Sequence, residues 1–174
     1  MEGGDGMKVK IKRLHPLAEI PTYGTDYSAG MDLTAVSVEI DERGNKVYHT
    51  GLAFEIPRGY AGFIFPRSSN AKKNLWLTNS VGIVDADYRG EVTLKYKTCL
   101  RMPNTFKTFL KMWFGISTDN DNIGIMNFWD NEDYKVGDRV GQLVIMPFPN
   151  IEFEEVSELS ETQRGAGGYG STGR

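Results

Sequence analysis

Short apolar stretches with a period of two, separated by turn-forming residues, constrain this chain more than any other feature. Val9 and Ile11, and later Val92, Leu94 and Tyr96, alternate with other residues, as on strands with one buried face. Other apolar runs are bounded by Gly, Pro, Asn or Asp, as buried strands are. We therefore expect an all-β domain, either a sandwich or a jelly roll. The further strand candidates are 36–40, 63–65, 75–77 and 142–147.

Length and charge limit the classes of protein. A chain of 174 residues can bury one sizeable core, so one domain is expected. The net charge of -3 argues against a broad face for nucleic acid, and we expect no direct nucleic-acid binding. No apolar run approaches the roughly 18 residues that span a bilayer. Cys99 is the single cysteine, which favours an intracellular location, cytoplasmic or, in a eukaryotic host, nuclear.

Composition divides the chain into segments. Residues 1–6 are Gly-rich and acidic and are expected to form a disordered leader before a β domain at 7–160. The stretch 101–133 interrupts the strand pattern, with aromatic spacing that suits a short helix followed by a strand or hairpin. Residues 161–174 include RGAGGYGSTG, with five Gly in ten residues, and are expected to form a flexible arm.

Two carboxylates stand out in the segment GIVDADYRGEV, which covers residues 82–92. Asp85 and Asp87 would face the same side if the segment is extended, because strand side chains alternate. Such a pair could poise a general base or hold a cation. The same DAD sequence also suits an ordinary solvated turn, so the segment alone does not assign a function.

Two other segments suit a nucleotide triphosphate. PRSSNAKK at 66–73 offers a guanidinium and two hydroxyls directly after a strand, which a polyphosphate requires, although a basic surface loop has the same composition. It lacks the glycine spacing and GK[ST] of a Walker loop. RGAGGYGSTG combines Tyr169, able to stack on a base, with phosphate donors, which is typical of a lid.

Five segments in order resemble the motifs of the trimeric dUTPase family. They run from the first strands to the last residues, and only the leader and 101–133 lie outside them. The resemblance implies a jelly-roll or β-barrel-like fold, a homotrimer, a small α/β insert, and Mg²⁺-assisted hydrolysis of dUTP to dUMP and pyrophosphate. The segments are SAGMDLTA at 28–35, PRSSNAKK at 66–73, GIVDADYRGEV at 82–92, GDRVGQLVIMP at 137–147 and RGAGGYGSTG at 164–173.

The resemblance assigns a role to each matching residue. Asp85 matches the aspartate that activates the attacking water, and Tyr88 the tyrosine that lies against the deoxyribose and excludes a ribose. Asn79, with the backbone around Ile83 and Thr93, matches the uracil-reading positions of a tight hairpin. The expected phosphate ligands are Arg67, Ser68, Ser69 and Gln142, with Arg164, Tyr169, Gly170, Ser171 and Thr172 on the arm.

The family resemblance also implies how the metal and the subunits contribute. Asp32 matches an aspartate that supports Mg²⁺ through water or stabilises the base of the site, while the triphosphate holds the ion. Each site would combine the first, second and fourth motifs of one subunit, the third of a neighbour and the fifth of the remaining one. His15 and His49 are isolated in sequence and are interpreted as surface or packing residues.

The sequence departs from the family pattern in three places. Tyr169 replaces the usual Phe, and Asn70 a usual aliphatic residue. The 46 residues between Gly90 and Gly137 exceed the usual short loop. Residues 101–133 could be a structural elaboration or could bind a protein partner, as some phage-encoded dUTPases with inserts do. The dCTP deaminases are relatives with the same fold, so deamination and a bifunctional enzyme are alternative functions. Binding of dUTP without hydrolysis is a further alternative.

Overall fold

The computed structural model describes residues 6–98 and 133–168. Within these ranges, regular structure consists of ten strands and one 3-10 helix, so the expected all-β class is confirmed. Residues 1–5, most of the 101–133 stretch and residues 169–174 lie outside the described residues. The predictions of a disordered leader and of a helix and strand in the insert therefore stay predictions.

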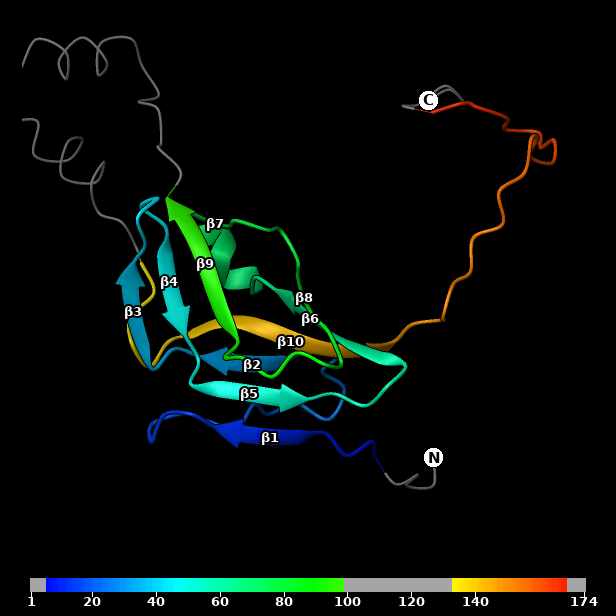
Figure 1. Ribbon diagram of the computed structural model, residues 1–174. Coiled ribbons are helices and arrows are strands. Elements are labelled where there is room, and N and C mark those ends of the chain that lie inside the picture. Colours follow the sequence, from blue (N-terminus) through cyan, green and yellow to red (C-terminus); the bar gives the residue numbers. More distant parts are fainter. Residues whose placement is uncertain (1–5, 99–132, 169–174) are drawn as a thin grey trace, which may run out of the picture.

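Two four-stranded antiparallel sheets enclose the core, and a two-stranded ribbon flanks them (Figure 1). In the first sheet the strand order is β2 (Met31–Thr34), β10 (Arg139–Pro147), β6 (Tyr60–Phe65) and β8 (Gly82–Val84). The second sheet has the order β3 (Ser37–Ile40), β4 (Lys46–His49), β9 (Thr93–Thr98) and β7 (Leu75–Leu77). The ribbon pairs β1 (Lys10–Arg13) with β5 (Leu52–Glu55), and the 3-10 helix η1 (Ser68–Lys72) follows β6.

Alternation along the strands builds the core between the sheets. Leu94 and Tyr96 of β9 are buried, whereas the side chains between them in sequence face outward, as the strand period requires. Gly141 lets the two sheets approach closely, because a Cβ at this position would overlap the Leu94 side chain. A larger residue at 141 would push β9 away from β10, which carries several of the expected site residues.

The predicted strands form, although not every predicted apolar face is buried. Trp76 at the centre of β7 is 54% exposed, and Ile40 on β3 is 71% exposed. Strand β3 is an edge strand that pairs only with β4 among the described strands. The period of two therefore predicted strand β3 but not the burial of its apolar side chains, which depends on what lies beyond the sheet edge.

The segment 148–168 leaves the sheets after β10 and runs away from them (Figure 1). Nearly every residue in it is exposed, and its apolar side chains are among the most exposed in the molecule: Phe153 is 96% and Leu159 87% exposed. These side chains have no apolar surface to cover them within the described chain. No helix among the described residues is long and apolar enough to cross a membrane.

Candidate active site

Asp32 on β2 gathers three of the expected or neighbouring site residues around one carboxylate. Its Oδ1 accepts hydrogen bonds from Arg67 Nε at 2.8 Å and Gln142 Nε2 at 3.3 Å, and its Oδ2 accepts one from Arg139 Nη1 at 2.9 Å. The side chain is only 14% exposed, and charge-assisted hydrogen bonds of this kind are stronger than neutral ones. The Asp32 cluster, meaning these four residues, therefore sets the positions of two guanidinium groups.

Strand register explains why these residues meet. Gln142 of β10 is directly opposite Asp32 of β2, and on the other side it is opposite Phe65, the last residue of β6. Arg67 follows two residues after that strand end. Because β10 lies between β2 and β6, it brings Asp32 of β2 close to Arg67, which follows the end of β6. Antiparallel pairing of the three strands is enough to produce this arrangement.

Arg139 was not among the residues singled out by sequence, and a β-bulge explains the omission. Arg139 and Gln142 are three residues apart, a spacing that would put them on opposite faces of a regular strand. The register shifts between Arg139 and Gly141, so that Arg139 pairs with Thr34 while Gln142 pairs with Asp32. A bulge adds one residue to one strand, and both side chains consequently reach the same carboxylate.

The expected phosphate-binding residues next to Arg67 lie on the short helix η1. Arg67 Nη1 donates to Ser69 Oγ at 3.3 Å, so the guanidinium that contacts Asp32 also contacts this hydroxyl. Ser68 is exposed and Ser69 is half-buried. The structure therefore brings Arg67, Ser69 and Gln142 together, with Ser68 beside them in sequence, as an anion-binding group requires.

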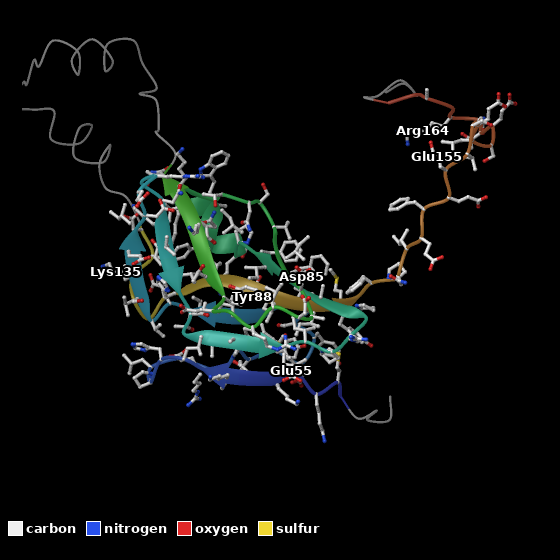
Figure 2. The ribbon with its side chains drawn as sticks, in the orientation of Figure 1. Glu55, Asp85, Tyr88, Lys135, Glu155 and Arg164 are labelled. Carbon is white, nitrogen blue, oxygen red and sulfur yellow. The ribbon has the colours of Figure 1, made fainter. Side chains whose placement is uncertain are left out.

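Asp85 stands at the end of β8, where the strand turns away from the sheet (Figure 2). Its side chain is exposed, and its carbonyl accepts a hydrogen bond from Tyr88 N at 3.1 Å. Residues 85–88 thus form a turn and not an extended strand, so the condition under which Asp85 and Asp87 would share a face is not met. The turn leaves the Asp85 carboxylate accessible to a water molecule.

Tyr88 is held by the same segment. Its hydroxyl donates to the carbonyl of Glu91 at 3.0 Å while the side chain stays 46% exposed. Gly90 makes this conformation possible, since a Cβ there would overlap the tyrosine hydroxyl. The hydroxyl is therefore tethered while the ring stays accessible, which suits a group that contacts a sugar.

Glu91 and His49 anchor this segment to the sheet, and neither was predicted to matter. Glu91 accepts hydrogen bonds from Gly51 N at 2.7 Å and shares one with His49 Nδ1 at 2.9 Å, while His49 Nε2 lies 3.5 Å from Glu39. The hydrogen bond to Glu91 is the main reason that the pKa of His49 is raised. His49 is isolated in sequence, but the fold brings it to Glu91 and Glu39, and these contacts could not be predicted from its sequence neighbours.

The expected uracil-reading residues lie on two different sheets. Asn79 is exposed in the turn after β7, Ile83 on β8 is 65% exposed, and Thr93 begins β9 half-buried. Because β8 pairs with β6 whereas β9 pairs with β4 and β7, the chain between Ile83 and Thr93 crosses from one sheet to the other. The prediction of a tight hairpin there is wrong as regards strand pairing.

Arg164 lies far from the other expected residues. Its Nε donates to the Gly167 carbonyl at 2.9 Å, and Figure 2 places it on the arm, well away from Asp85 and Tyr88. Tyr169, Gly170, Ser171 and Thr172 lie outside the described residues. A single chain therefore assembles the Asp32 cluster but does not bring Arg164 to it.

Comparisons with known proteins are consistent across nearly the whole chain. The dUTPase family profile matches residues 17–99 and 115–173. The deoxyuridine 5'-triphosphate nucleotidohydrolase of Nautilia profundicola is 40% identical over 170 residues, covering 97% of this chain and all of the relative. That of Syntrophotalea carbinolica is 37% identical, covering 95% of this chain and 96% of the relative.

Solved structures agree with these relatives in fold. The dUTPase of Staphylococcus bacteriophage 80alpha, solved with dUPNHPP, superposes with a TM-score of 0.68 at 26% identity, covering 96% of this chain and 99% of the other. The dUTPase of phage phi11 of S. aureus, described as having a species-specific insert, has a TM-score of 0.63 at 23% identity. Coverage there is 90% of this chain and 100% of the other.

Proposed function

This chain belongs to the dUTPase family and hydrolyses dUTP to dUMP and pyrophosphate, and we propose that Asp85 activates the attacking water. The accessible carboxylate at the end of β8 would take one proton from water as its oxygen attacks the α-phosphorus. The bond from that phosphorus to the bridging oxygen breaks, and pyrophosphate leaves with the electron pair. Positioning and charge neutralisation are the main catalytic demands of such a displacement.

The geometry of the Asp32 cluster is the main observation in support of dUTP hydrolysis at this site. Arg67 and Gln142, with Ser68 and Ser69, are proposed to hold the α- and β-phosphates. Their geometry is fixed before substrate arrives, because Asp32 contacts both Arg67 and Gln142. Arg139, held at 2.9 Å by the same carboxylate, adds a second positive charge to the phosphate side. Preorganised donors of this kind avoid reorganisation cost during the reaction.

Magnesium fits this arrangement as an ion carried by the triphosphate. Bound there, Mg²⁺ would neutralise phosphate charge and would keep several waters of its own. The described residues contain no group of three or more His, Cys, Asp or Glu side chains that could hold a metal. Both oxygens of Asp32 already accept hydrogen bonds. We therefore propose that Asp32 serves the ion indirectly, by holding the guanidinium groups of Arg67 and Arg139 beside the phosphates.

Selection of the nucleoside is assigned to the segment between β7 and β9. Tyr88 presents an accessible ring, which is proposed to lie against the deoxyribose and to clash with a 2′-hydroxyl. Asn79 and the backbone at Ile83 and Thr93 are proposed to read uracil by its hydrogen-bonding edge. A site that reads a base in this way rejects an analogue with reversed donors, since buried polar groups would stay unpaired.

The exposed segment 148–168, which leads into the arm, supports a homotrimer in which subunits share their sites. Its exposed apolar residues, such as Phe153, alternate with acidic ones such as Glu152 and Glu154. The β1 ribbon offers a complementary surface: β1 pairs with β5 on one side only and carries exposed basic residues, including Lys12 and Arg13. An exposed apolar arm is costly in an isolated chain.

In the trimer the arm is proposed to act as a lid over a neighbouring site. Arg164, Ser171 and Thr172 would reach the γ-phosphate, and Tyr169 with Gly170 would cover the base. This division supports treating 7–160, with the 101–133 insert, as the β domain, 161–174 as the lid arm and 1–6 as a leader. An intracellular location is proposed from the single cysteine.

A protein partner at residues 101–133 is the second proposal. Phage dUTPases, among them that of bacteriophage 80alpha, control transfer of virulence genes, and the phi11 enzyme has a species-specific insert. The corresponding stretch here lies almost entirely outside the described residues. Deleting 103–130 tests the idea: an active trimer that keeps every interaction of the full chain would contradict it.

One substrate panel tests the main proposal. The protein with Mg²⁺ is incubated separately with dUTP, dCTP, UTP and dTTP, and the products are identified. We expect dUMP and pyrophosphate from dUTP and little turnover of the other three nucleotides. Ammonia released from dCTP would indicate deamination instead, and dUTP binding without any product would indicate a non-enzymatic role.

A further inference from the structure

The helix that carries the proposed phosphate ligands is weakly supported by its own sequence. Helix η1 has five residues, none of them buried, and no side chain caps its N-terminus. Short 3-10 helices have poor hydrogen-bond geometry, and isolated turns of helix are marginal in water. Contacts with the rest of the chain must therefore hold Ser68 and Ser69 in place.

Asn70 supplies two such contacts from the middle of η1. Its Nδ2 donates to the Leu75 carbonyl at 2.8 Å, at the start of β7. Its Oδ1 accepts a hydrogen bond from the Tyr134 hydroxyl at 3.2 Å. Asn70 is the residue that departs from the aliphatic family pattern, and these two bonds explain how a polar side chain is accommodated at this half-buried position.

Tyr134 is a rigid support for that hydrogen bond. Only 4% of the residue is exposed, and its ring packs edge-on against Tyr48 at 5.8 Å and tilted against Tyr96 at 5.6 Å. Such aromatic contacts are directional. The Lys73 ammonium, just past the end of η1, lies 4.5 Å from the centre of the Tyr134 ring. Burial raises the pKa of Tyr134, and its interaction with Ser69 opposes that shift.

We propose that Asn70 and Tyr134 are positioning residues that fix helix η1 so that Ser68 and Ser69 meet the α- and β-phosphates of dUTP. Neither residue needs to touch the nucleotide. The hydrogen bond between them joins η1 to the tyrosine cluster of Tyr48, Tyr96 and Tyr134, and so to β4 and β9 of the second sheet. This inference rests on the proposed function, because it explains the contact between Asn70 and Tyr134 by the binding of the dUTP phosphates.

The position of Tyr134 in the chain gives the contact a further consequence. Tyr134 follows Asp133, which is the last residue of the 101–133 stretch and forms an ion pair with Lys46 of β4. The end of this stretch is thus tied to β4, and Tyr134 directly after it contacts helix η1.

The test compares two variants that each remove one hydroxyl from the same cluster. Tyr134→Phe removes the donor to Asn70, whereas Tyr48→Phe removes a hydroxyl that has no hydrogen-bond partner among the described residues. We would measure four quantities for both variants. They are the binding constant of dUpNHpp, the ligand in the 80alpha phage structure, the inhibition constant of deoxyuridine, and KM and kcat for dUTP. Deoxyuridine reports on the nucleoside site alone because it has no phosphate.

For Tyr134→Phe we expect dUpNHpp to bind about fivefold more weakly, as the loss of one neutral hydrogen bond predicts. KM for dUTP should rise by a similar factor, kcat should change less than twofold, and deoxyuridine inhibition should be unchanged. Tyr48→Phe should behave as the wild type in all four measurements. A matching loss of deoxyuridine affinity in Tyr134→Phe would show a general structural role and overturn the inference.

A double variant guards against a simple loss of stability. Asn70→Leu with Tyr134→Phe replaces both polar partners by apolar groups, which can be nearly neutral for folding. We expect its melting temperature to approach that of the wild type while dUpNHpp affinity stays reduced. Wild-type affinity in the double variant would overturn the inference. If the wild-type chain fails to hydrolyse dUTP, the proposed function falls and the inference falls with it.

Discussion

The Asp32 cluster and the Asp85–Glu91 segment contribute to the site in opposite ways. Asp32, Arg67 and Gln142 satisfy one another within one chain before any ligand is present. The side chains of Asp85 and Tyr88 are exposed, and the hydrogen bonds of this segment include those of the Asp85 carbonyl, the Tyr88 hydroxyl and the Glu91 carboxylate. The proposed grip on the α- and β-phosphates is thus assembled within one chain, whereas the proposed base and sugar-contacting ring face outward and await something from outside it.

The largest expected effect comes from the outward-facing region. Asp85→Asn keeps the size and the turn of the side chain but removes the proton acceptor, so kcat for dUTP should fall by about a thousandfold. Binding of dUpNHpp should stay within about twofold, because the phosphate grip is elsewhere. Asp87→Asn is the matched control and should retain most activity. Substantial turnover by Asp85→Asn would remove Asp85 from its assigned role.

A smaller but clear effect is expected from the pre-paired region. Asp32→Asn weakens the charge-assisted hydrogen bonds from Arg67 and Arg139, which should lower kcat/KM for dUTP by about ten- to a hundredfold. Both dUpNHpp affinity and melting temperature should drop together, since the carboxylate holds the cluster in the free protein. Asp26→Asn, in the exposed loop before β2, serves as a control for a lost surface carboxylate. An Asp32→Asn enzyme with full dUpNHpp affinity would refute the preorganised grip.

The smallest effect concerns the anchor of the Asp85–Glu91 segment. The hydrogen bond to Glu91 raises the pKa of His49 above its ordinary value of 6.5. The charged histidine therefore contributes stability that is fully present below pH 6.5 and is lost as the pH rises through the folded-state pKa.

Comparing His49→Gln with the wild type by denaturant unfolding between pH 5.5 and 9 tests this anchor. The stability difference between the two proteins should be largest at the acidic end and should shrink at the alkaline end. His15→Gln is the control, as His15 accepts only a backbone hydrogen bond from Leu17. A difference that grows with pH would contradict the assignment.

Local patterns predicted the parts of this molecule that depend on nearby residues. The period of two identified β1, β3 and β9, and apolar runs bounded by turn residues identified β6, β7 and β10. Motif resemblance named Asp85, Arg67 and Gln142, and the register of β10 confirms that the last two lie together.

Other features could not be predicted because they depend on distant parts of the chain. Arg139 reaches Asp32 through a bulge, which the alternation rule does not foresee. The contacts of His49 with Glu91 and of Asn70 with Tyr134 join residues 42 and 64 positions apart. The predicted tight hairpin is not formed by pairing of β8 with β9. The two strands are close in sequence but pair with strands of different sheets.

Complementation between two inactive variants tests most directly whether the two regions come from different subunits. Asp85→Asn chains retain the phosphate grip, and Arg67→Ala chains retain the base, so each homotrimer alone should be nearly inactive. After unfolding and refolding together in equal amounts, about one site in four should combine an intact Arg67 with an intact Asp85 from its neighbour. We expect dUTP hydrolysis near a quarter of the wild-type rate in the mixture. A mixture no more active than the separate variants would show instead that each site is built within one chain.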